Sequence, residues 1–251
     1  MTQVIESLST LQLVRKNLKG TVGFVPTMGA LHAGHGKLLE QARAENDYVI
    51  LSVFVNPTQF NNKDDLAKYP KTLESDLEIA KKFNVDYVWV PTYSQLYPDE
   101  YTYKVSENNL STRFCGAHRP GHFDGVLTVV MKLFNLAQPT RAYFGEKDFQ
   151  QLSLIQGMAK SFFLNPEIVP VPTVREESGL AMSSRNVHLS AEEKHKAPLL
   201  YKTIKNAKTP EEAAQKLTDL GFKVDYVEDL GNRRLAAAFL GTTRLIDNVE
   251  L

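Results

Sequence analysis

Two histidines stand three residues apart in the stretch TMGALHAGHGKLL, residues 27–39, where a helical pattern begins. If the helix has started there, His32 and His35 share a face beside the amide groups of its first turn, which have no partner within the helix. Those amides and the helix dipole attract phosphate, and two imidazoles can stabilise oxygens that gain charge in phosphoryl chemistry. The spacing therefore predicts an anion site, and the glycines and alanines around it would let a large ligand lie against the backbone.

Other roles remain open for this pair. Either histidine alone could cap the helix or pack, with the glycines serving a turn. A two-histidine metal site has little support, because no cysteine or carboxylate accompanies the pair with ligand spacing. The common phosphate loops G-x-x-x-x-G-K-[ST] and G-x-G-x-x-G do not occur in the chain. A nucleotide site would therefore use a different arrangement.

The stretch FGEKDFQQ, residues 144–151, combines a cation, a carboxylate and an amide after a short apolar run. Lys147 can bind a phosphate as a point charge, Asp148 can hold Mg²⁺ or a hydroxyl, and Gln151 can bond a substrate one turn further on. The alternative is a solvated helix start, where acidic residues are common.

Two further loops carry polar groups suited to a substrate. AMSSRN, residues 181–186, offers two hydroxyls and an arginine, which predict either a clamp over a polyphosphate or a solvated turn. VNPTQF, residues 55–60, places the neutral amides of Asn56 and Gln59 after an apolar run, where they suit hydroxyls and a carboxylate. Turn formation at the Asn-Pro step is the alternative there.

A second pair of histidines lies in GAHRPGHFDG, residues 116–125. His118 and His122 are separated by Pro120 and Gly121, which exclude a zinc pair on one helix face. We expect a loop entering a helix. Arg119 could act in catalysis or tie two loops together.

The elements that must position these loops alternate between strands and helices. Short apolar runs predict strands at residues 21–26, 47–57, 85–91, 141–144 and 166–172, and periodic stretches predict helices at 35–46, 71–83, 125–137 and 148–163. This alternation predicts an α/β fold with a Rossmann-like, doubly wound parallel sheet. Ligands of such sheets lie at the carboxyl ends of the strands, where the strand order reverses. Three of the polar loops, PTMGALHAGH, NPTQF and GEKD, are predicted to fall at that edge.

A change in texture near Val174 predicts a second, smaller α+β domain. We expect a nucleotide- and substrate-binding domain at residues 1–173 and a lid domain at residues 174–251. Two helices are predicted within the lid domain, at 190–207 and 209–221, each with a capping pair. The residues that follow them alternate between apolar and polar, as in strands. The capping pairs are Ser190 with Glu193 and Thr209 with Glu212.

Composition narrows the class of protein. Of the 251 residues 43% are hydrophobic and 23% charged, as in soluble globular proteins, and Lys plus Arg equals Asp plus Glu at 29 each. Without a global basic field, no nucleic-acid partner is expected, and without a long apolar run no membrane partner is expected. Residues 1–20 lack the pattern of a secretory signal, and the single Cys115 fits a reducing compartment, so we expect a cytoplasmic protein.

Five stretches in order carry a family resemblance. They are PTMGALHAGH, VNPTQF, RPGHFDGV, FGEKDFQQL and GLAMSSRN, and together they resemble the motif set of pantothenate synthetases, the pantoate–β-alanine ligases. The H-x-G-H core alone, a form of the HIGH motif, would indicate only the nucleotidyltransferase superfamily, which includes class I aminoacyl-tRNA synthetases. The resemblance runs from about residue 20 to residue 190, and TRLIDN near the end is also similar to the family.

The resemblance implies an AMP-forming carboxylate–amine ligase of coenzyme A precursor synthesis. The carboxylate of (R)-pantoate would attack the α-phosphate of ATP to give pantoyl adenylate and pyrophosphate. The β-alanine amine would then attack the adenylate to give pantothenate and AMP. Mg²⁺ bound with ATP and a homodimer are also implied.

Residue roles follow from the same resemblance. The implied catalytic residues are His32, His35, Lys147 and Arg185, with His35 the candidate proton donor. The implied ATP-binding residues are Met28, Gly29, Ala30, Leu31, His32, Ala33, Gly34, His35, Gly145, Glu146, Lys147, Asp148, Val174, Met182, Ser183, Ser184 and Arg185. Gln59 and Gln151 would bind pantoate, with Gln59 also near β-alanine, and Asn56 and Tyr69 are further candidates for that pocket. The protein itself is expected to supply no metal site beyond Asp148 near the Mg²⁺ of ATP.

The sequence departs from the family pattern at two places, and it allows two other functions. Cys115 stands where many members of the family have glutamate, which puts a polar role there in question. The connection between the last predicted strands is short, so we expect a trimmed lid. A nucleotidyltransferase that stops after transferring AMP or CMP shares the H-x-G-H motif, and a non-catalytic nucleotide-binding module would keep the fold; the two histidines, Lys147 and Arg185 argue against lost chemistry.

Overall fold

Six parallel strands form the central sheet of the computed structural model, which describes residues 2–251. They are β1 (Gln3–Ile5), β2 (Val22–Thr27), β3 (Tyr48–Val53), β4 (Tyr87–Trp89), β5 (Arg141–Gly145) and β6 (Glu167–Val171). The order across the sheet is β1-β4-β3-β2-β5-β6, so the direction of winding reverses between β2 and β5. The predicted Rossmann-like sheet is confirmed. Only β1 was not predicted, because its three residues are too few to show a pattern.

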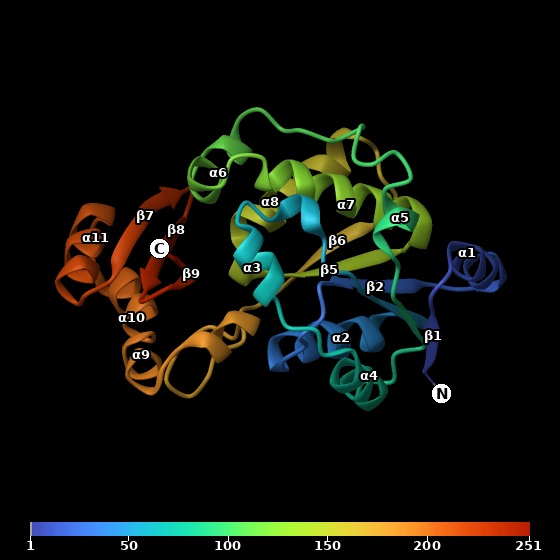
Figure 1. Ribbon diagram of the computed structural model, residues 1–251, viewed down its shortest axis with the longest axis horizontal. Helices are drawn as coiled ribbons and strands as arrows, with labels where there is room; N and C mark the ends of the chain where they lie inside the picture. The colour runs from blue at the N-terminus through green and yellow to red at the C-terminus, as the bar shows by residue number, and fades with distance from the viewer. Residues whose placement is uncertain (1) are drawn as a thin grey trace.

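Helices cover both faces of this sheet (Figure 1). On one face lie α2 (Ala33–Glu45) and α4 (Leu73–Lys82), and on the other lie α1 (Leu8–Asn17), α7 (His122–Ala137) and α8 (Phe149–Ser161). Successive strand residues point to opposite faces. Phe24 accordingly belongs to the core beneath α7, and Val25 to the core beneath α2. Both faces are buried, which explains why these strands read as continuous apolar runs.

Beyond β6 the chain builds a smaller antiparallel sheet with helices against it, at the end of the molecule coloured orange and red in Figure 1. Its strands are β7 (Lys223–Leu230), β8 (Arg233–Leu240) and β9 (Thr243–Glu250), and its helices are α9 (Ala191–Lys196), α10 (Leu199–Asn206) and α11 (Pro210–Asp219). The single helix predicted at 190–207 is two helices, because Pro198 lacks the N–H that would continue the first.

The predicted capping pairs are present with one difference. Ser190 Oγ accepts from Glu193 N at 3.2 Å and Glu193 accepts from Ser190 N at 2.7 Å, which is a full capping box. Thr209 Oγ1 accepts from Glu212 N at 3.2 Å, but the Glu212 carboxylate bonds the amide of Lys208 at 2.7 Å instead of that of Thr209.

Short helices that the sequence did not predict border the carboxyl edge of the large sheet. They are α3 (Lys63–Lys68), α5 (Tyr93–Leu96) and α6 (Cys115–His118). Three of the polar loops also wind into short 3₁₀ helices, at Pro57–Gln59, Glu146–Asp148 and Ser184–His188. These turns fix the direction of the side chains that follow the strands.

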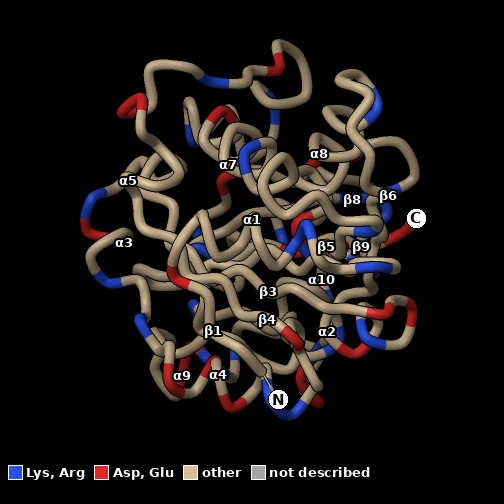
Figure 2. Tube along the Cα trace, turned by 90° about the vertical axis from the view of Figure 1, so that its right-hand side faces the viewer, with Lys and Arg blue, Asp and Glu red and all other residues tan. Residues whose placement is uncertain are grey.

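Charges of both signs are distributed over the whole trace in Figure 2, in keeping with the balanced composition. Among residues 2–251, no helix combines the length and the apolar character needed to cross a lipid bilayer.

Candidate functional site

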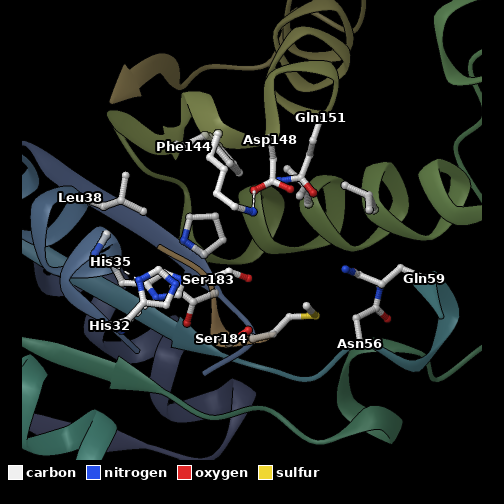
Figure 3. Close-up of a pocket in the computed structure, with 18 of the residues that line it drawn as sticks. His32, His35, Leu38, Asn56, Gln59, Phe144, Asp148, Gln151, Ser183 and Ser184 are labelled. Carbon is white, nitrogen blue, oxygen red and sulfur yellow. Dashed lines mark hydrogen bonds and ion pairs between the residues drawn. The ribbon is translucent and has the colours of Figure 1, made fainter. Parts of the chain in front are cut away.

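A cavity of about 260 Å³ opens at the carboxyl ends of β2, β3 and β5, where the strand order reverses. This is the position at which doubly wound sheets bind their ligands. The sequence-predicted residues that line it are Met28, His32, Gly34, His35, Asn56, Gln59, Tyr69, Gly145, Lys147, Asp148, Gln151, Val174, Met182, Ser183, Ser184 and Arg185. Four separate loops therefore meet at one site, as Figure 3 shows for the eight of these residues that it labels.

Five residues predicted for ATP binding lie beside the cavity without lining it: Gly29, Ala30, Leu31, Ala33 and Glu146. The amides of Ala30 and Leu31 donate to the carboxylate of Asp76, at 3.1 and 2.7 Å. Asp76 lies on α4 and is only 1% exposed. Gly29 adopts a φ of +79° there, and a Cβ on it would come within 2.9 Å of the same carboxylate. The buried Asp76 thus shapes the turn before α2. The sequence did not predict this role, because acidic residues are common in the first turn of a helix such as α4.

The two histidines form the start of α2 through their Nδ1 atoms. His32 Nδ1 accepts from Gly34 N at 3.1 Å, and His35 Nδ1 accepts from His32 N at 3.3 Å. A Cβ on Gly34 would lie 2.8 Å from Cε1 of His32, so this cap requires glycine. Because each Nδ1 is an acceptor, each neutral ring carries its proton on Nε2. Capping and phosphate binding, alternatives in the sequence, are compatible here because they use different nitrogens.

Both imidazoles are neutral near pH 7. Burial lowers the pKa of His35 to about 3, with further lowering by His32 and Lys147. Burial also lowers the pKa of His32 to about 4, with Lys147 adding to the effect. The ring centroids are 4.1 Å apart, a distance at which two charged rings would repel. The site therefore offers two uncharged Nε2–H donors at the positive end of a helix.

Positive charge comes from Lys147, in the turn after β5. Its Nζ lies 3.7 Å from the carboxylate of Asp148, which is the acidic side chain among the cavity-lining residues. The turn is held from the small sheet, since Asn248 Nδ2 donates to the carbonyls of Glu146 and Lys147 at 2.8 and 3.1 Å. Glu146 itself pairs with Arg233 at 3.0 Å, so its carboxylate serves this contact between the sheets.

The loop with the two serines and Arg185 already contacts the large sheet's edge. Arg185 pairs with Asp65 of α3 at 3.0 Å, and Ser184 Oγ donates to Tyr69 Oη at 3.4 Å. At the base of this loop Arg175 makes two hydrogen bonds to Asp247 of β9, at 2.7 and 2.8 Å. Asp247 and Asn248 both lie in the TRLIDN stretch. Neither residue was assigned a role from the sequence, and the similarity of this stretch to the family was the one indication that they matter.

Gln59 is aimed by its neighbour Asn56. Asn56 is 1% exposed, and its Nδ2 donates to Gln59 Oε1 at 3.0 Å and to the Gly125 carbonyl at 3.1 Å. Its Oδ1 accepts from Thr58 and Tyr97 at 3.0 and 2.8 Å. With its carbonyl oxygen engaged, Gln59 presents its NH₂ group to the cavity (Figure 3).

Arg119 and His122 hold the backbone of the same loop. Both N–H donors, Arg119 Nη2 and His122 Nδ1, point to the Gln59 carbonyl, at 3.2 and 2.7 Å. The structure therefore contains the connection between two loops that the sequence allowed for Arg119. Both side chains also line the cavity, so this connection lies within the site.

Cys115 lies at the contact with the small sheet. Its Sγ is 3.2 Å from Tyr226 Oη and 3.4 Å from Arg244 Nη1, and Arg244 also pairs with Asp225 at 2.8 Å. The position therefore keeps polar neighbours although its side chain is a thiol. Metal-ligating groups of three or more His, Cys, Asp or Glu do not occur among residues 2–251.

The fold and the site together define a class: a Rossmann-like nucleotide-binding protein with an H-x-G-H helix start at its switch point. The family model described as Pantoate-beta-alanine ligase matches residues 2–250. The chain belongs to the pantoate–β-alanine ligase family, and the resemblance of its motifs is confirmed.

Individual relatives agree over the whole length. The pantothenate synthetase of Bdellovibrio bacteriovorus is 64% identical and is covered over 100% of both chains. That of Coxiella burnetii is 49% identical over 99% of this chain and 97% of the relative. The crystal structure of pantoate–β-alanine ligase from Francisella tularensis, complexed with beta-gamma ATP and β-alanine, superposes with a TM-score of 0.95 at 39% identity and covers 100% and 98% of the two chains.

Proposed function

We propose that this protein condenses (R)-pantoate with β-alanine, using ATP and releasing AMP and pyrophosphate, by way of pantoyl adenylate. Family membership supports the reaction. The observation that carries the proposal is the division of the cavity: the imidazoles of His32 and His35 lie on one side of it and the amide of Gln59 on the other (Figure 3). One side suits the phosphates of ATP and the other a small polar acid.

In the first step, a pantoate carboxylate oxygen attacks the α-phosphorus, and the bond from that phosphorus to the bridging oxygen of pyrophosphate breaks. Negative charge grows on the phosphoryl oxygens, where the Nε2–H groups of His32 and His35 and the ammonium of Lys147 are placed to stabilise it. Fixed donors of this kind stabilise the transition state more than the ground state. Arg185 would leave Asp65 for a phosphate of ATP.

In the second step, the β-alanine amine attacks the acyl carbon, loses a proton, and displaces AMP. Gln59 and Gln151 would orient pantoate through its hydroxyls. The apolar side chains of Val126, Val130 and Leu133, which line the cavity from α7, offer a surface for the two methyl groups of pantoate. The loop with Ser183 and Ser184 would exclude water from the adenylate, which hydrolyses readily.

Further parts of the proposal concern partners and organisation. Mg²⁺ would enter with ATP and neutralise phosphate charge. It binds through one or two carboxylates plus phosphates and water, which fits the single lining carboxylate of Asp148. We also propose a cytoplasmic homodimer without a nucleic-acid partner, built from a binding domain at residues 1–173 and a lid domain at residues 174–251.

The test is the release of pyrophosphate and AMP from ATP, Mg²⁺ and pantoate, with and without β-alanine. We expect AMP and pantothenate in quantity only when β-alanine is present. Accumulation of free activated product without any amine would instead indicate a nucleotidyltransferase. ATP binding without cleavage under all conditions would indicate a non-catalytic module and overturn the proposal.

A further inference from the structure

Arg119 brings a positive charge that no neighbouring side chain neutralises. Its Nη2 donates to the Gln59 carbonyl at 3.2 Å and its Nη1 contacts His122 Nε2 at 3.1 Å. His122 accepts this bond, because its Nδ1 donates to the same carbonyl at 2.7 Å. Burial, with the adjacent Arg119, lowers the pKa of His122 to about 3, so this partner carries no charge. The guanidinium is therefore held in place by neutral groups.

The other cations of the cavity have carboxylate partners. Lys147 lies 3.7 Å from Asp148 and Arg185 lies 3.0 Å from Asp65. Arg119 has no carboxylate within 4.0 Å among residues 2–251. Burial lowers the pKa of Arg119 to about 10, which leaves it cationic at neutral pH. Arg119 is half-buried, and a charge withdrawn from water without a partner is costly, a cost that a ligand of opposite charge would remove.

Resting on the proposed function, we propose that Arg119 binds the carboxylate of the amine substrate, and so selects an ω-amino acid over an amine that lacks a carboxylate. A guanidinium has five N–H donors in a planar fork that matches a carboxylate. Gln59 and His122 occupy two of the five, which leaves donors for a ligand.

The position of Arg119 distinguishes the two substrate carboxylates. The pantoate carboxylate is consumed at the α-phosphate, next to His32 and His35. The β-alanine carboxylate takes no part in the chemistry and must lie away from the acyl carbon that the amine attacks. Arg119 stands on the Gln59 side of the cavity, bonded to that residue's backbone, which suits the unreacted carboxylate.

Arg119→Gln and Arg119→Lys test this proposal, with Arg113→Gln as the matched control. Arg113 is exposed, its guanidinium lies over the Phe114 ring at 4.8 Å, and it does not line the cavity. Two assays are needed. Pantoate-dependent exchange of pyrophosphate into ATP, without amine, reports adenylation, and the ratio of kcat/KM for β-alanine over β-alaninamide reports recognition of the carboxylate.

We expect Arg119→Gln to keep the exchange rate within a few-fold of the unmodified protein. Its KM for β-alanine should rise about 10- to 100-fold, as expected for the loss of a hydrogen bond to a charged group. Its preference for β-alanine over β-alaninamide should be lost. Arg119→Lys retains a cation and should keep the preference at a raised KM, which also serves if the glutamine variant fails to fold. Arg113→Gln should match the unmodified protein in both assays.

Three results separate the possibilities. If Arg119→Gln loses exchange and amine transfer equally while the β-alanine preference persists in the residual activity, the role is structural and the proposal is overturned. Where only Arg119→Lys folds, an equal loss of exchange and amine transfer overturns it. An unchanged preference with unchanged KM overturns it as well. If the unmodified protein shows no pantoate-dependent exchange, the proposed function fails, and with it the ground for this inference.

Discussion

Each imidazole of the H-x-G-H pair uses one nitrogen for the helix start and presents the other to the cavity. The spacing of His32 and His35 predicted their common face, since three residues nearly complete a helical turn. Their charge state could not be predicted, because it depends on burial and on Lys147, which is 112 positions further along the chain from His35. The same holds for Arg119, one of 29 basic residues until the fold shows it without a carboxylate partner.

A change of His35 to asparagine separates its two roles. Asparagine Oδ1 can replace Nδ1 as the acceptor for His32 N, but it offers no donor where Nε2–H stood. We expect single-turnover adenylation to fall roughly 100- to 1,000-fold, as for other lost transition-state donors. Thermal unfolding should stay near that of the unmodified protein, whereas His35→Ala should also lose about 1 kcal/mol with the cap. Near-normal adenylation by His35→Asn would remove the ring from the chemistry.

The lowered histidine pKa values predict an acid-sensitive fold. Above pH 6.5 neither the folded nor the unfolded chain binds protons at these rings, so they add nothing to the pH dependence. As the pH falls below 6.5 the unfolded chain takes up protons that buried His35 and His122 refuse until about pH 3. The free energy of unfolding should therefore fall by up to about 1.4 kcal/mol per pH unit for each ring.

Denaturant unfolding between pH 7.5 and 4.5 measures this dependence. His122→Asn, which keeps a donor for the Gln59 carbonyl but cannot titrate, should show a shallower loss than the unmodified protein. Equal slopes for both proteins would mean that His122 titrates normally in the folded state.

At the scale of elements, α4 acts on the site through a single side chain, Asp76, which binds the turn before α2. The helix was predicted from its apolar periodicity, and its acidic first turn had an ordinary explanation in the helix dipole. That Asp76 instead faces inward and binds the amides of Ala30 and Leu31 depends on how α4 crosses the sheet. Ala30 adopts a φ of +51°, uncommon for a residue with a side chain, and the two bonds hold it there.

Asp76→Asn should therefore damage the turn. The substitution is almost isosteric, but an NH₂ group would face a backbone N–H in place of an acceptor. We expect a loss of about 1–3 kcal/mol in stability and a drop of roughly tenfold or more in kcat/KM for ATP. Glu74→Gln removes an exposed charge from the same helical turn and should change neither. Equal effects of the two substitutions would refute the positioning role.

At the scale of the whole molecule, the small sheet completes a site built on the large one. Alternation of strands and helices predicted the large sheet well, because each strand is buried on both faces. Contacts between the sheets could not be predicted, since Asn248 and Lys147 are distant in sequence and meet only in the folded chain. The division of the predicted helix at Pro198 is different, because it could have been predicted from the sequence: proline interrupts a helix, and the prediction gave it too little weight.

Asn248→Ala tests whether the small sheet positions Lys147. The variant loses hydrogen bonds to two carbonyls, and we expect kcat/KM for ATP to fall roughly 10- to 100-fold through misplacement of the lysine. Asn232→Ala is the control, because Asn232 lies exposed in the β7–β8 turn and its side chain donates to Glu250 at 3.2 Å, away from the cavity. ATP kinetics unchanged by Asn248→Ala would assign the contact to stability alone.

The strand order also decides how this protein meets other copies of itself. A large sheet ends in two rows of backbone groups that can pair with another chain and start aggregation. Here one outer strand, β1, has only three residues, and the other, β6, contains Pro170, which has no N–H to donate. Both margins are poor templates for strand addition, so the sheet is protected against growing from one molecule into the next.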